Sequence, residues 1–187
     1  MIKWQTRFEI AQQFYDRRSL FRLSQVKWII KHAEDRLDGK TLFFGSGRDS
    51  FMWSKLTDVT FIESQKRWYR KLFEEPRNKE LCVHLVGYST RVDSWQEDLR
   101  KQVVSELPED VLEQKYDLIV IDGPKGNKPS APGRVSPILQ AKELINEGGL
   151  IVVDDFGREL ESNVARDVLG EPDDTHRSRS RLACWYC

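Results

Sequence analysis

The chain has 187 residues, 39% of them hydrophobic, which fits one folded domain with an adequate core. Its 30 basic and 30 acidic side chains cancel, so no basic excess predicts a nucleic-acid partner. No apolar stretch approaches the roughly 20 residues that span a bilayer, and the first residues lack the apolar region of a signal peptide. The odd number of cysteines argues against a disulfide framework. We therefore expect a soluble cytoplasmic protein, or a domain excised from a longer one, with no membrane segment.

The spacing of apolar residues predicts helices over residues 5–37 and, from residue 41, repeated β–α–β units. The predicted strands are 41–44, 59–62, 81–86, 118–121 and 150–153, and the predicted helices are 50–55, 64–73, 94–107, 136–146 and 159–169. A polar stretch follows at 171–180, and the run 182–186 is predicted to form an edge strand. Strands that are apolar throughout indicate a sheet buried on both faces. We expect a Rossmann-like α/β fold with a mostly parallel sheet, in one domain made of a helical segment (1–38) and a core (39–187).

Acidic residues and a lysine follow the fourth and fifth predicted strands. Asp122 and Lys125 come after 118–121, and Asp154 and Asp155 come after 150–153. Because the carboxyl ends of the strands form the ligand crevice in an open α/β sheet, these side chains should converge there. Oxygen ligands suit a hard divalent cation such as Mg²⁺ or Mn²⁺. The sequence therefore predicts a metal site made by Asp122, Asp154 and Asp155, with Lys125 as a general base.

A purely structural interpretation of the same residues stays open. Asp122 begins an Asp-Gly-Pro sequence that is typical of a turn, and Asp154 and Asp155 could cap the following helix. A lysine beside a glycine-rich loop is often simply solvated.

The first predicted strand leads into the glycine-rich turn Gly45-Ser-Gly47-Arg-Asp49-Ser50, and the second ends at Glu63. In Rossmann-like folds an acid at this second position holds the ribose hydroxyls of an adenosine. A dinucleotide site prefers a third glycine where Ser50 stands, and Asp49 would repel a pyrophosphate. The pattern favours S-adenosylmethionine, with its positive sulfonium, over NAD. The alternative is that the glycines only make the turn and Glu63 is a solvated strand end.

Four ordered motifs resemble the plant glucuronoxylan methyltransferases and their polysaccharide-biosynthesis relatives. They are Phe44-Gly-Ser-Gly-Arg-Asp-Ser-Phe-Met-Trp53, Tyr88-Ser-Thr-Arg-Val92, Ile121-Asp-Gly-Pro124 and Ala131-Pro-Gly-Arg134. The resemblance implies a class I methyltransferase fold and a cofactor site made by Gly45, Ser46, Gly47, Asp49, Ser50, Glu63, Ser64, Tyr88, Thr90 and Asp122. It also implies that the acceptor sugar lies beside Arg134, with Lys125 and Arg158 as further substrate-binding residues.

The chain departs from that family at two places. Ser130 stands where the plant proteins carry an acid before Ala-Pro-Gly-Arg, and Asp154-Asp155 stands where they often carry His-Asp. The acids are also similar to those of catechol O-methyltransferase-like enzymes, which bind magnesium and place a lysine three residues after the first acid, as Lys125 follows Asp122 here. By that similarity Asp155 replaces an amide ligand, and Lys125, Asp122 and Asp154 are the catalytic residues.

The expected function is therefore methyl transfer from S-adenosylmethionine to a sugar hydroxyl of a glycan or polysaccharide, assisted by a divalent metal. A nicotinamide-dependent sugar oxidoreductase and a noncatalytic module that binds cofactor or glycan are the alternatives from other classes. Within the methyltransferases, RNA and phenol acceptors remain alternatives.

Overall fold

The computed structural model describes residues 3–17, 21–94, 107–178 and 180–187. The helices are α1 (Trp4–Phe14), α2 (Leu23–His32), α3 (Ser50–Trp53), α4 (Lys66–Glu74), α5 (Glu109–Leu112), α6 (Val135–Leu144) and α7 (Glu159–Leu169). The strands are β1 (Lys40–Phe44), β2 (Asp58–Glu63), β3 (Cys82–Leu85), β4 (Tyr116–Ile121), β5 (Ile145–Val153), β6 (Asp174–Arg177) and β7 (Arg181–Tyr186). Short 3₁₀ turns occur at Pro76–Asn78 and Val92–Ser94. Most of the helix predicted over 94–107 lies outside the described residues.

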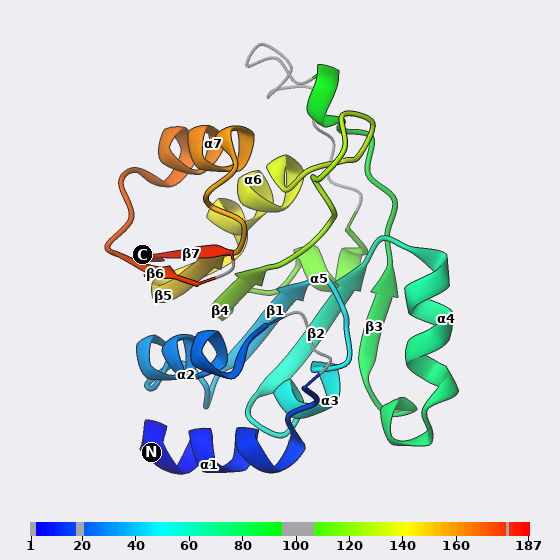
Figure 1. Cartoon of the computed structure of the whole chain (residues 1–187), viewed down its shortest axis with the longest axis vertical. Coiled ribbons are helices and arrows are strands. Elements are labelled where there is room, and N and C mark those ends of the chain that lie inside the picture. The colour runs from blue at the N-terminus through cyan, green and yellow to red at the C-terminus, as the bar shows by residue number, and fades with distance from the viewer. Residues whose placement is uncertain (1–2, 18–20, 95–106, 179) are drawn as a thin grey trace.

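The strands form one sheet in the order β3-β2-β1-β4-β5-β7-β6 (Figure 1). β1 to β5 run parallel, as the sequence predicts, whereas β7 runs antiparallel to both β5 and β6. The prediction that residues 182–186 form an edge strand is wrong, because β7 lies inside the sheet and β6 forms the edge. β6 comes from the stretch predicted to be only polar. Its exposed side chains suit an edge, while the buried run from Leu182 to Trp185 suits an internal strand.

Alternate residues of the apolar strands enter two separate cores. Leu42 and Phe44 of β1 pack into one core, and Phe43 between them packs into the other. The residues of β4 and β5 divide in the same way, because successive side chains of a strand point to opposite faces. This explains why these strands read as continuous apolar runs rather than as an alternating pattern.

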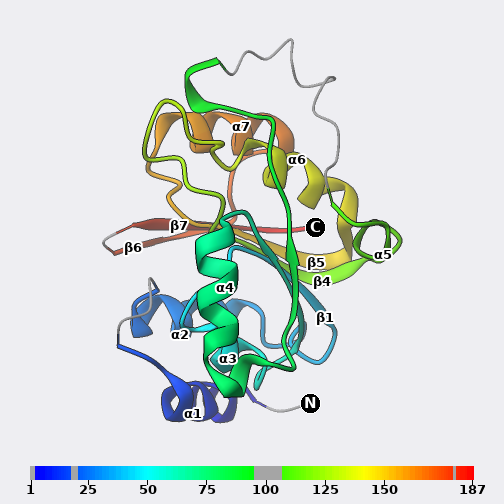
Figure 2. The same ribbon diagram turned by 90° about the vertical axis from the view of Figure 1, so that its right-hand side faces the viewer.

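Helices cover each face of the sheet (Figures 1 and 2). α1, α2 and α3 lie on one face and α6 and α7 on the other, while α4 packs against β2 and β3. The predicted N-terminal helical segment is therefore two helices in contact with each other, and α2 contributes Val26, Ile29 and Ile30 to the core. None of the helices in the described part of the chain has the length and apolar character that crossing a bilayer requires.

The three cysteines are free thiols in different surroundings. Cys82 and Cys187 are exposed, whereas Cys184 of β7 is buried in the core that α2 covers. Burial raises the pKa of the Cys184 thiol to about 12.

Candidate functional site

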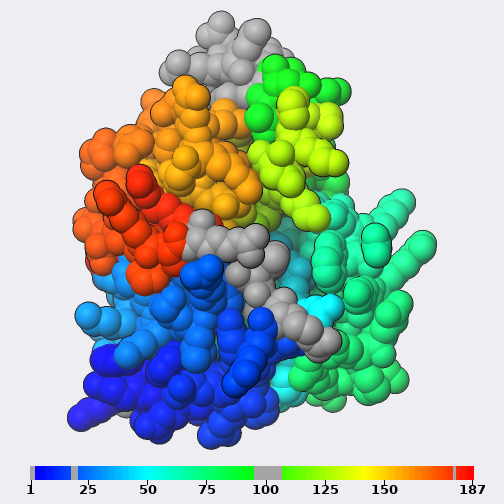
Figure 3. All heavy atoms as spheres, in the orientation of Figure 1, coloured from blue at the N-terminus to red at the C-terminus, as the bar shows by residue number. Residues whose placement is uncertain are grey.

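The carboxyl ends of β1, β2 and β4 surround a cavity. It is lined by the turn after β1, by the end of β2 and the start of α4, by Tyr88, and by the loop after β4: Gly45, Ser46, Gly47, Arg48, Ile62, Glu63, Ser64, Gln65, Trp68, Tyr88, Asp122, Gly123, Pro124 and Lys125. In the space-filling view, the loop after β4 (yellow-green) and α4 (green) stand on either side of a recess (Figure 3). A cavity at the carboxyl ends of parallel strands is where folds of this type bind ligands.

Two glycines bring the ends of β1 and β4 together at the floor of this cavity. Gly45 adopts φ +106°, a left-handed conformation that favours glycine. A Cβ on Gly123 would lie 3.0 Å from the Cα of Gly45, so side chains are excluded on both sides of the contact. The amides of Asp122 and Gly123 both donate to the carbonyl of Phe44, at 2.9 and 2.7 Å. The turn thus needs glycine for its own packing, as well as for the open backbone that a ligand would meet.

Glu63 fixes the shape of the glycine-rich turn from β2. Its Oε2 accepts hydrogen bonds from the amide and the hydroxyl of Ser46, at 3.1 and 2.7 Å. Its Oε1 accepts from the amides of Ser64 and Gln65, both at 2.8 Å. The side chain is buried and lines the cavity. The carboxylate is therefore held in one position at the predicted ribose end of the site.

Three residues predicted to bind cofactor do not line this cavity. Asp49 is buried behind the turn, where the indole N–H of Trp53 donates to it at 3.4 Å and burial raises its pKa. The hydroxyl of Ser50 accepts from the amide of Gly47 at 3.0 Å. Thr90 is buried and is not one of the residues that line the cavity. Asp49 and Ser50 thus support the turn rather than face the cavity.

A second cavity adjoins the first along α4. The two share Ser46, Gly47, Arg48 and Trp68, and the second extends to Lys71, Leu72, Glu75 and Asn78. A third, open cavity lies beyond the loop after β4, between Val92 and the start of α7. Arg158, Glu161, Lys128 and Asn127 are among its lining residues. Lys125 is exposed at the rim of the first cavity and is followed directly by Gly126 of the third.

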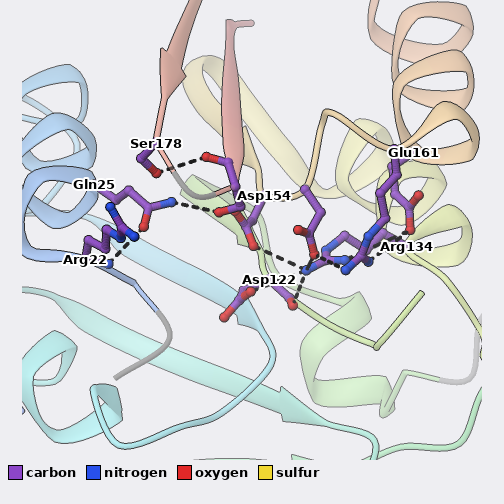
Figure 4. A network of polar contacts seen from close by, with 10 residues as sticks. Arg22, Gln25, Asp122, Arg134, Asp154, Glu161 and Ser178 are labelled. Carbon is purple, nitrogen blue, oxygen red and sulfur yellow. Dashed lines mark hydrogen bonds and ion pairs between the residues drawn. The ribbon is translucent and has the colours of Figure 1, made fainter. Parts of the chain in front are cut away.

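Arg134 joins the three acids that follow β4 and β5 (Figure 4). Its side chain is only 3% exposed, and its Nη2 lies 2.8 Å from Asp155 Oδ2 and 3.4 Å from both Asp122 Oδ1 and Asp154 Oδ2. The same nitrogen donates to the backbone carbonyl of Asp122 at 2.7 Å. The sequence predicts that these acids converge, and their positions confirm it. It also predicts that Arg134 contacts the acceptor, but the structure places its guanidinium among the acids.

Electrostatics at this cluster follow from burial and proximity. Burial raises the pKa of Asp122 well above its usual range, and the nearby Asp154 raises it further, while Arg134 acts in the opposite direction. Burial alone would lower the pKa of Arg134, but the charges of Asp122, Asp155 and Asp154 outweigh it and raise the pKa. The guanidinium therefore stays charged.

The cluster continues to Ser180, Gln25 and Glu161, which the sequence interpretation missed, and to Arg158, which it predicted to bind substrate. Ser180 donates to Asp154 Oδ1 at 2.6 Å and accepts from Gln25 of α2 at 2.9 Å. On the other side, Arg158 Nη2 lies 2.7 Å from Asp155, and its Nη1 lies 3.7 Å from Glu161. Glu161 shares the buried face of α7 with apolar residues, and Gln25 does the same on α2. A polar residue among the apolar residues on one side of a helix is the sequence pattern that could have identified Glu161 and Gln25.

The predicted divalent-metal site does not fit this arrangement. A metal needs free carboxylate oxygens that point to a common empty position. Here the guanidinium of Arg134 lies at the point where the three carboxylates meet. Within the ranges that the structure covers, no group of three or more acidic, histidine or cysteine side chains has the arrangement of a metal site.

Comparison with known proteins identifies relatives of the chain. The model of the IRX15/IRX15L/GXM family matches residues 97–182. Arabinogalactan O-methyltransferase 2 of Arabidopsis thaliana is 25% identical over 91% of this chain and 66% of its own length. Glucuronoxylan 4-O-methyltransferase 3 of the same plant is 33% identical over 68% of this chain and 51% of its own length. This chain is similar in sequence to these plant polysaccharide O-methyltransferases.

The chain spans about half to two thirds of the length of these polysaccharide O-methyltransferases. The range that the family model matches includes Asp122, Arg134, Asp154 and Ser180, whereas the glycine-rich turn precedes it.

The fold is that of the class I methyltransferases. The 16S rRNA N2 G1207 methyltransferase RsmC of T. thermophilus, solved in complex with AdoMet and guanosine, superposes with a TM-score of 0.63 at 13% identity. The match covers 88% of this chain and 42% of RsmC. The Rossmann-like class I methyltransferase fold predicted from the sequence is confirmed.

Proposed function

We propose that this chain is an S-adenosylmethionine-dependent O-methyltransferase that acts on a sugar hydroxyl of a glycan or polysaccharide. One observation carries the proposal: the glycine-rich turn after β1, Glu63 after β2 and Asp122 after β4 bound the same cavity. The names of the relatives support both the reaction and a carbohydrate acceptor.

Residues of the first cavity would bind the cofactor, which supplies the methyl group. Glu63 would accept a hydrogen bond from a ribose hydroxyl in place of the one that the Ser46 hydroxyl now donates, while the backbone of Gly45, Ser46 and Gly47 lies against the amino-acid portion. Ser64 and Tyr88 line the same space. Glu63 adds a negative group to a lining that also holds Arg48 and Lys125, and it would repel a pyrophosphate placed beside it.

The acceptor would enter from the third cavity, with Arg158 among its contacts. Lys125 stands between the two cavities, so its Nζ would take the proton of the hydroxyl as the oxygen bonds to the methyl carbon and the S–CH₃ bond breaks, with S-adenosylhomocysteine as the leaving group. Transfer is an in-line displacement, and positioning the hydroxyl accounts for much of such catalysis. The divalent metal predicted from the sequence is not part of this proposal, because Arg134 lies where the ion would bind.

The first test is a calorimetric titration of S-adenosylhomocysteine into the purified protein, with NAD in a parallel titration. Binding of S-adenosylhomocysteine and not NAD is expected. It would justify screening polysaccharide, RNA and phenol acceptors. Selective NAD binding would instead support the oxidoreductase, and binding of neither would refute the cofactor assignment.

Glu63→Ala supplies a sharper version of this test. Loss of hydrogen bonds to a charged group costs about 1–3 kcal/mol, so the dissociation constant for S-adenosylhomocysteine should rise about 5- to 150-fold. Glu80→Ala is a matched control, because Glu80 is exposed and lies outside the cavity. Unchanged affinity in a folded Glu63→Ala variant would remove Glu63 from the cofactor site.

A further inference from the structure

The guanidinium of Arg134 lies among three carboxylates, at the point where a bound metal ion would lie. One guanidinium nitrogen lies within 3.4 Å of Asp122, Asp154 and Asp155, and the side chain is 3% exposed. Buried carboxylates at this spacing repel one another unless a positive charge lies between them. The guanidinium supplies that charge at the carboxyl ends of β4 and β5, where the sequence predicts a metal ion.

Neighbouring groups orient the acids toward the guanidinium. Asp155 adopts φ +57°, rare for a residue with a side chain, and its carboxylate binds Arg134 and Arg158 together. Asp154 divides its two oxygens, one to Ser180 and one toward Arg134. Each acid is thus already in contact with a donor that belongs to the protein.

We propose that Arg134 is a built-in counter-ion that replaces a divalent metal, so that the native protein binds no divalent cation at these acids. Arg134 acts as a positioning residue, which fixes the three acids, of which Asp122 lines the first cavity. A guanidinium has no open coordination position and cannot bind the acceptor oxygen as a metal would. The acceptor proton must then pass to a side chain.

The acids are expected to become a metal site when the guanidinium is removed. Arg134→Ala would leave three carboxylates converging on an empty position, the ligand set that Mn²⁺ and Mg²⁺ prefer. Arg134→Lys would keep one positive charge near the acids. The two variants therefore separate the loss of charge from the loss of the planar guanidinium.

The experiment titrates Mn²⁺ into native protein and variants. Free Mn²⁺ is followed by electron paramagnetic resonance, and the unfolding temperature is measured in EDTA and in Mn²⁺. The native protein and Arg134→Lys should bind no Mn²⁺ and show the same unfolding temperature in both solutions. Arg134→Ala should unfold at a lower temperature in EDTA, bind one Mn²⁺ and recover several degrees. Adding Asp154→Asn to Arg134→Ala should abolish that gain.

Arg166→Ala is the matched control, because Arg166 pairs with Glu171 in an exposed position on α7. It should respond to Mn²⁺ as the native protein does. Stoichiometric Mn²⁺ binding by the native protein, lost on Asp154→Asn, would overturn the inference even if Arg134→Ala does not fold. A folded Arg134→Ala protein that gains no Mn²⁺ would overturn it too. Neither result bears on S-adenosylhomocysteine binding, which tests the proposed function separately.

Discussion

Asp122 lies at the first cavity, and burial there makes ionisation of its carboxyl group unfavourable. It lines the first cavity, the proposed cofactor site, and burial together with Asp154 raises its pKa well above the usual range. The folded protein therefore holds the Asp122 proton more tightly than the unfolded chain does. This contribution to stability is fully present below the usual carboxyl pKa of about 4 and is lost as the pH rises through the raised pKa.

Asp122→Asn should accordingly be more stable than the native protein at pH 7, because the amide needs no ionisation in the interior. The advantage should shrink toward pH 4. Thermal unfolding between pH 4 and pH 8 measures it, since each kcal/mol changes the unfolding temperature by about 2–4 °C for a chain of this size. Asp93→Asn, at an exposed ion pair with Arg91, is the control. A variant less stable than the native protein at pH 7 would mean that attraction to Arg134 outweighs burial.

For some residues of the site, residue type and position in the chain were sufficient to predict where the side chain lies. For others, the location could be known only from the folded structure. Asp122, Asp154 and Glu63 each follow an apolar strand, so the sequence alone placed them at one edge of the sheet. The role of Arg134 depends on burial, because an exposed arginine in the same loop would be free to contact the acceptor. Ser180 lies in a polar stretch, and no periodic pattern in that stretch predicts the pairing of the strands beside it.

At the scale of elements, the contact between the ends of β1 and β4 sets the floor of the cavity. A Cβ on Gly123 would meet the backbone Cα and N of Gly45 at 3.0 and 3.2 Å. Backbone atoms in the turns that directly follow two paired parallel strands cannot move aside as a flexible side chain can. The glycine-rich turn and the Asp-Gly-Pro turn therefore constrain each other.

Gly123→Ala should destabilise the protein by about 1–3 kcal/mol, the usual cost of overpacking, and should weaken S-adenosylhomocysteine binding as the strands separate. Chemical denaturation and calorimetry measure the two effects. Gly157→Ala is the control, because its Cβ would meet only the Cβ of Arg181, at 3.8 Å. Equal stability of the two variants would show that the turns have room to adjust.

The parallel elements were predictable because each is an apolar strand followed by a helical pattern. β6 was not, since its four residues, Asp174–Arg177, are polar or charged and gain their place only by pairing with β7. β5 begins at Ile145, five residues before the predicted strand, because the polar and glycine residues in between extend the backbone without adding to the apolar run. Hydrogen bonding to a neighbouring strand, rather than amino-acid composition, determines where β6 forms and where β5 begins.

For the whole molecule, one sheet separates two cores, and the N-terminal helices close one of them. Val26, Ile29 and Ile30 of α2 are fully buried against that face. At about 25 cal/mol for each Å² of apolar surface removed from water, this layer contributes substantially to folding. We therefore predict that residues 1–38 and 39–187 form one cooperative unit.

Deletion of residues 1–38 should leave an apolar sheet face open to water and yield a protein that aggregates in size-exclusion chromatography. Ile29→Ala is the milder variant, with an expected cost of about 2–5 kcal/mol in denaturant unfolding. A monomeric 39–187 fragment that unfolds cooperatively would instead show that the helices are a separate attachment.

The three free thiols differ in exposure, so their rates of modification can report local opening of the structure. Cys82 and Cys187 are open to solvent, whereas Cys184 lies sealed between β5, β6 and α2 with its thiol pKa raised to about 12. Because the thiolate is the reactive form and burial raises the pKa of the Cys187 thiol, a maleimide or iodoacetamide pulse should modify Cys82 and then Cys187. It should reach Cys184 only while α2 is separated from the sheet. Mass spectrometry of the intact protein over time would then report the frequency of that opening, and no cysteine would need to be introduced by mutation.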